Sequence, residues 1–239
     1  MTEAIDPKKA MTRKLWLHSI LIAFGASGFY YLYVILLDGP FTLTSFAKVM
    51  AGTANFLFAA SLSLSSFGYF FDFLDSKIVY RKYLGLLGYF AALTYALLLP
   101  VLRPDRYWYG IAENFWSSDI LLGLSSMAVF TGMAFISNDR AMLIIGPGRW
   151  RNLLRSGYLA FFLLVIRAAM NESNPIGADP RPEFWWHYLQ TFETLPPPRL
   201  LFSIIGTSVV LFRLSVEFDK WRKRRLVAAT TYAASSNGV

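Results

Sequence analysis

Six long apolar segments dominate the chain, and short polar or basic stretches separate them. They are Leu15–Leu37, Phe46–Phe71, Leu84–Leu102, Ile120–Ser137, Leu153–Met170 and Leu200–Phe218. An α-helix rises about 1.5 Å per residue, so each segment can cross a hydrocarbon layer of roughly 30 Å, the fourth and fifth only just. The segments are longer than the alternating strands of about ten residues in membrane barrels, and they are apolar on all faces. The pattern therefore predicts an all-α integral membrane bundle of six transmembrane helices.

Composition supports lipid as the solvent of this bundle. Hydrophobic residues make up 55% of the 239 residues and charged residues 16%, whereas soluble domains average about 25% charged residues. The chain divides into an N-terminal tail (1–14), a transmembrane domain (15–218) and a basic C-terminal tail (219–239). It contains no cysteine, which excludes disulfides, thiolate metal sites and a cysteine nucleophile.

The basic residues lie mainly in alternate connections between the segments. Seventeen lie on one predicted side, namely Lys8, Lys9, Arg13, Lys14, Lys77, Arg81, Lys82, Arg140, Arg149, Arg151, Arg155, Arg213, Lys220, Arg222, Lys223, Arg224 and Arg225. The other side holds only four, namely Arg103, Arg106, Arg181 and Arg199. Such an asymmetry predicts that both termini are cytoplasmic. It also accounts for the net charge of +8 without a nucleic-acid partner.

Polar side chains inside membrane segments are candidates for function. Lys48 is expected to extend its ammonium group to the outer headgroups, and Asn55 to hydrogen-bond between helices. His18 is expected to lie in a helix contact or at the interface. Arg167 has three open interpretations: it extends outward, it pairs with a carboxylate, or it holds an anionic ligand.

The longer predicted outer loops are rich in aromatic residues. One of them carries Trp185, Trp186 and His187. Aromatic side chains of this kind favour the membrane interface, so an aromatic belt is the first interpretation. A docking surface for a periplasmic partner is the second.

Two short stretches of the chain follow a recognisable pattern. The first is Arg81–Leu86, which leads into Phe90–Tyr95, and the second is Gly148–Leu154, followed by Tyr158 and Leu159. These stretches resemble the ferric-reductase-like transmembrane family, in particular the haem-binding membrane subunit of the bacterial periplasmic methionine-sulfoxide reductase system. The resemblance covers roughly Leu15–Met170. It implies a bacterial inner-membrane protein whose third and fifth helices face each other across a haem.

The chain departs from this family where the haem ligands are expected. The positions at which the family has histidines are occupied by Tyr95, Leu154 and Arg167. The remaining histidines, His18 and His187, lie at a different depth and in a loop, so they cannot complete a ligand pair. Haem is therefore not predicted.

The leading hypothesis is a haem-free relative, and the sequence favours a non-enzymatic role without deciding it. It would be a structural, docking or assembly subunit of a larger inner-membrane complex, in contact with lipid and a protein partner. The alternative is an electron-transfer protein that holds a quinone, or an atypically ligated haem, near Tyr95 and Arg167. A transporter is disfavoured because the sequence has neither an inverted repeat nor a pair of broken helices.

Overall fold

The computed structural model describes residues 7–169 and 198–236, and these residues form helices with no strand among them. Six helices are long: α1 (Pro7–Asp38), α2 (Leu43–Phe70), α3 (Tyr80–Leu102), α5 (Ser118–Ile136), α7 (Pro147–Ala169) and α9 (Pro198–Ser236). Shorter helices connect them: η1 (Asp72–Lys77), η2 (Asp105–Tyr109), α4 (Ile111–Asn114) and α6 (Asp139–Ile145). Each long helix overlaps one of the six apolar segments, so the all-helical prediction is confirmed.

Four of the long helices are both long enough and apolar enough to cross a membrane. Their spans are Ala10–Leu37, Leu43–Phe70, Tyr80–Leu102 and Leu201–Val227. The apolar part of α5 is shorter, from Ile120 to Ile136. Helix α7 has sufficient length but carries four arginines, namely Arg149, Arg151, Arg155 and Arg167. Together, the four apolar helices indicate a membrane protein.

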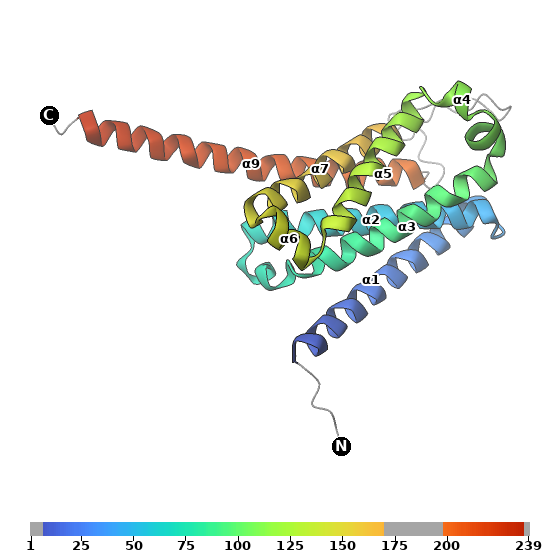
Figure 1. Cartoon of the computed structure of the whole chain (residues 1–239), viewed down its shortest axis with the longest axis horizontal. Helices are drawn as coiled ribbons and strands as arrows, with labels where there is room; N and C mark the ends of the chain where they lie inside the picture. The colour runs from blue at the N-terminus through green and yellow to red at the C-terminus, as the bar shows by residue number, and fades with distance from the viewer. Residues whose placement is uncertain (1–6, 170–197, 237–239) are drawn as a thin grey trace, which may run out of the picture.

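Helix α2 lies at the centre of the bundle. It packs against α1, α3 and α9, while α7 packs against α5 and α9 (Figure 1). Small residues on α2 and α3 permit this close approach. A Cβ atom added at Gly52 would lie 2.4 Å from the Tyr30 ring of α1, and one added at Gly88 would lie 3.2 Å from Leu57 of α2.

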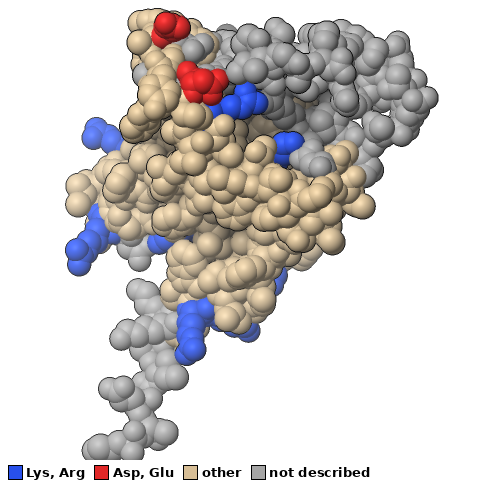
Figure 2. All heavy atoms as spheres, turned by 90° about the vertical axis from the view of Figure 1, so that its right-hand side faces the viewer, with Lys and Arg blue, Asp and Glu red and all other residues tan. Residues whose placement is uncertain are grey.

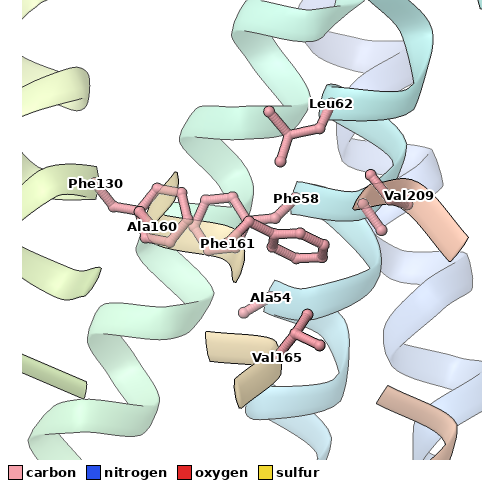
Figure 3. Packing of buried hydrophobic residues seen from close by; sticks show 9 residues of the cluster. Ala54, Phe58, Leu62, Phe130, Ala160, Phe161, Val165 and Val209 are labelled. Atoms are coloured by element: carbon pink, nitrogen blue, oxygen red, sulfur yellow. The ribbon is translucent and has the colours of Figure 1, made fainter. Parts of the chain in front are cut away.

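The core of the bundle is filled by apolar side chains from four helices (Figure 3). The rings of Phe58 on α2 and Phe130 on α5 stack with centroids 4.0 Å apart. Ala160 and Phe161 of α7 are fully buried beside them. The remaining members of the cluster are Ala54, Ala59, Leu62, Val165 and Val209. Aromatic stacking and close contact thus occupy the space where these helices meet.

Two helices extend beyond the apolar segments that predicted them. Helix α1 begins at Pro7, and α9 continues to Ser236, so the basic stretch after Phe218 is helical up to that residue. These extensions are rich in Lys, Arg and Ala, which favour helix without needing burial. Helix α9 has 39 residues and is about 58 Å long. Its C-terminal part projects away from the bundle (Figure 1).

The opposite end of the bundle carries η2 and α4. Seen from that end, most of the described surface is uncharged; acidic side chains lie at its upper edge with a basic side chain beside them, and other basic side chains lie toward the left and lower edges (Figure 2). Helix α2 begins at this end, where Thr42 caps it: the backbone N–H of Ser45 donates to the Thr42 hydroxyl at 3.1 Å. Thr44 and Ser45 lie inside the helix.

Candidate functional site

The two sequence stretches that carry the family resemblance meet in space. Arg81 lies at the start of α3, and its Nη2 donates to the backbone carbonyl of Leu154 on α7 at 3.5 Å. The same guanidinium lies 5.9 Å from the ring centroid of Tyr158, one turn further along α7. The contact joins the beginnings of α3 and α7 at the end of the bundle where α2 stops.

Tyr158 is held in place by α2. Its hydroxyl donates to the carbonyl oxygen of Leu62 at 2.9 Å and lies 2.5 Å from the Ser65 hydroxyl. One turn earlier on α2, the hydroxyl of Ser61 donates to the carbonyl of Arg81 at 2.8 Å. Both partners of the Arg81–Tyr158 contact are therefore positioned by the central helix.

Helix α9 adds a second cation to the same ring. The guanidinium of Arg213 lies 4.9 Å from the Tyr158 centroid, a distance typical of cation–π contact. Arg213 also pairs with Glu217 at 2.5 Å, and Lys220 approaches the same carboxylate at 3.3 Å. The charge of Arg155, on α7, acts on both Arg81 and Glu217. We call Arg81, Arg155 and Arg213 the basic cluster.

A second polar contact fixes α9 beside the end of α2. The hydroxyl of Tyr69 donates to Asp219 at 2.7 Å. Lys223 pairs with the same carboxylate at 2.7 Å and lies over the Tyr69 ring. Charged and aromatic groups of α2, α3, α7 and α9 therefore contact one another at this end of the bundle.

Arg167 lies at the other end of α7, directed toward α5. A Cβ atom added at Gly123 would lie 3.0 Å from its Nη1 and 3.2 Å from its Cζ. Gly123 therefore provides the space into which this half-buried guanidinium fits. The side chain points toward a neighbouring helix, an orientation typical of arginines within a membrane segment.

Tyr95 is half-buried on α3. Its side chain makes no hydrogen bond or ring contact within the described residues. No described contact joins Tyr95 to Arg167, so their common role in binding a cofactor stays a prediction.

The other predicted residues lie apart from one another. His18 of α1 contacts the start of α3, where its Nδ1 lies 2.8 Å from the Tyr80 hydroxyl and the two rings stack. Asn55 is buried on α2, and its amide has no hydrogen-bond partner among the described residues. Lys48 is half-buried seven residues before it. Trp185, Trp186 and His187 lie outside the described residues.

The basic cluster is the feature that the sequence did not single out. Arg155 and Arg213 entered the sequence argument only as signals of orientation, and Arg81 entered it also as the first residue of a stretch that carries the family resemblance. Arg213 nevertheless lies within the apolar segment Leu200–Phe218, and a charged residue in such a position is a candidate for function. The position of Arg213 within an apolar segment was the one feature of the sequence that could have indicated the cluster.

Neither the comparison with protein-family models nor the comparison with curated proteins finds a match for this chain.

Proposed function

We propose that this protein is a haem-free, ferric-reductase-like subunit of a bacterial inner-membrane complex, with a structural, docking or assembly role. In this proposal α5 and α7 also span the membrane, which gives six spans with both termini in the cytoplasm. The excess of basic residues at the end with the basic cluster supports this orientation.

The packed core carries the proposal. The side chains of Phe58, Phe130 and Phe161 fill the space between α2, α5 and α7. A b-type haem needs a flat cavity between facing helices and two axial ligands. The core is filled by stacked rings, and the chain has two histidines. Both observations favour a subunit that supports a complex over a subunit that transfers electrons.

The projecting part of α9 supplies surface for a partner. Residues 221–227 are exposed, and Arg225 stacks on Trp221 at 4.0 Å. Exposed tryptophan and arginine are typical anchors of protein interfaces. Lys223 of this stretch holds α9 against Tyr69, whereas the described ring contacts of Trp221 are with Phe218 and Arg225 of its own helix. A change at Trp221 should therefore leave the fold intact.

The experiment is purification of the tagged full-length chain from its native membrane in a mild detergent, followed by mass spectrometry. We expect a stoichiometric membrane partner. A Trp221→Ala variant should lose that partner, while Trp116→Ala, an exposed tryptophan at the opposite end, should keep it. Recovery of the chain alone, under conditions that preserve other inner-membrane complexes, contradicts the proposal.

A further inference from the structure

Arg81 is a half-buried cation whose contacts within the described residues are all with neutral groups. Its guanidinium reaches the carbonyl of Leu154 and the ring of Tyr158. No carboxylate pairs with it within the described residues. A guanidinium removed from water is costly unless an opposite charge or several hydrogen bonds compensate. Five N–H donors are available on the group, and one of them is used by Leu154.

The surroundings of Arg81 add positive charge. Arg155 and Arg213 both act on it electrostatically. The nearby carboxylate is Glu217, which Arg213 and Lys220 share. Among the described residues, four cations (Arg81, Arg155, Arg213 and Lys220) therefore surround one carboxylate, which leaves an excess of three positive charges. Such a concentration of cations attracts an anion to the space between them.

The geometry selects the kind of anion. Arginines present pairs of N–H groups that match the oxygens of phosphate, and such hydrogen bonds are stronger than neutral ones. The cluster lies between α3, α7 and α9, near the end of α2, where the apolar spans give way to polar residues. Basic pockets between helices at this level of a membrane bind phospholipid headgroups.

We propose that the basic cluster binds a phosphate group, presented either by the headgroup of an anionic phospholipid or as the free anion. Arg81 and Arg213 hold the phosphate oxygens above the ring of Tyr158, and Arg155 closes the site from the exposed side. This site is independent of haem content and of any partner protein.

The test uses the full chain in nanodiscs of phosphatidylcholine, with two separate additions. One is a minor fraction of phosphatidylglycerol, and the other is inorganic phosphate at the same phosphate concentration. Native mass spectrometry measures retained phosphatidylglycerol, and the unfolding temperature reports both additions. Wild-type protein should retain one phosphatidylglycerol. The Arg155→Gln variant should retain it about fivefold less, the effect of one surface charge. The Arg81→Gln variant, which removes a half-buried charge, should retain it at least about fivefold less.

Arg155 is exposed, so its substitution measures binding without disturbing the packing around Arg81. Arg224→Gln is the matched control, because it removes the same charge from an exposed position on α9 away from the cluster. If phosphatidylglycerol raises the unfolding temperature and inorganic phosphate does not, the ligand is the lipid headgroup. If inorganic phosphate raises it as well, the site recognises the phosphate group itself. Equal retention by wild type, Arg155→Gln and Arg224→Gln overturns the proposal.

Discussion

The contact between Gly52 and Tyr30 makes the packing of α1 on α2 testable by a single methyl group. In a Gly52→Ala variant the new Cβ would lie 2.4, 2.6 and 2.7 Å from three carbons of the Tyr30 ring. Carbon atoms in favourable contact are about 3.5–4.0 Å apart. The ring must therefore move by about 1 Å. It has little freedom to do so, because Tyr30 is 1% exposed and packs with Val34 and Val49.

Overpacking of this kind costs about 1–3 kcal/mol, which exceeds the gain of up to about 1 kcal/mol from replacing glycine by alanine in a helix. The Tm of Gly52→Ala should therefore fall, by about 2–4 °C per kcal/mol for a chain of this size. The assay is thermal unfolding of the purified protein in one detergent. Gly28→Ala on α1 is the control, since its added Cβ meets nothing within 4 Å and its Tm should stay level or rise.

A second variant separates the steric cause from a general intolerance of change at Gly52. Replacing Tyr30 by leucine removes the ring, so Gly52→Ala should cost less in a Tyr30→Leu background than in the wild type. Contacting residues couple in this non-additive way. The reasoning is refuted if Gly52→Ala has a Tm equal to or above that of Gly28→Ala, or if the two substitutions are additive.

Three further predictions concern topology and two polar contacts. A reporter fused after Val239 should be cytoplasmic and one inserted within residues 175–196 periplasmic; finding both on one side of the membrane contradicts the six-helix arrangement. The Arg167→Leu variant should be about 1–3 kcal/mol less stable in thermal unfolding, because the guanidinium lies between helices. An unchanged Tm would show instead that the side chain extends to the lipid headgroups. Tyr158→Phe removes the hydroxyl that donates to the carbonyl of Leu62 and should lower the free energy of unfolding by about 0.5–1.5 kcal/mol. The control Tyr109→Phe, at an exposed position, should leave it unchanged. Equal stabilities of the two variants would refute the assigned hydrogen bond.

The helices were predictable because a membrane helix is encoded locally by a long apolar run. The ends of α1 and α9 were not, because an apolar run stops at the membrane surface while helix formation depends on propensity and continues through Lys, Arg and Ala. Pro7 and Ser236 mark these later limits. Hydropathy thus located the helices, and it did not show how far they extend.

The polar contacts depend on which helices become neighbours, which the linear pattern does not contain. His18 and Tyr80 lie 62 residues apart, and Arg81 and Leu154 lie 73 apart. Arg213 came to the ring of Tyr158 because α9 packs against both α2 and α7. The sequence marked Arg167 as a candidate through its position in an apolar run. Its neighbour Gly123 became apparent only once α5 and α7 were packed together.

The measurement that tests the central claim most directly is the haem content of the purified full-length protein. The protein should be produced in cells supplied with excess haem precursor and assayed as the pyridine haemochrome, together with its absorption spectrum. Our account predicts no Soret band and no stoichiometric haem, because side chains such as Phe58 and Phe130 fill the core and Tyr95 and Arg167 occupy the expected ligand positions. One haem per chain would contradict it and would favour the electron-transfer alternative.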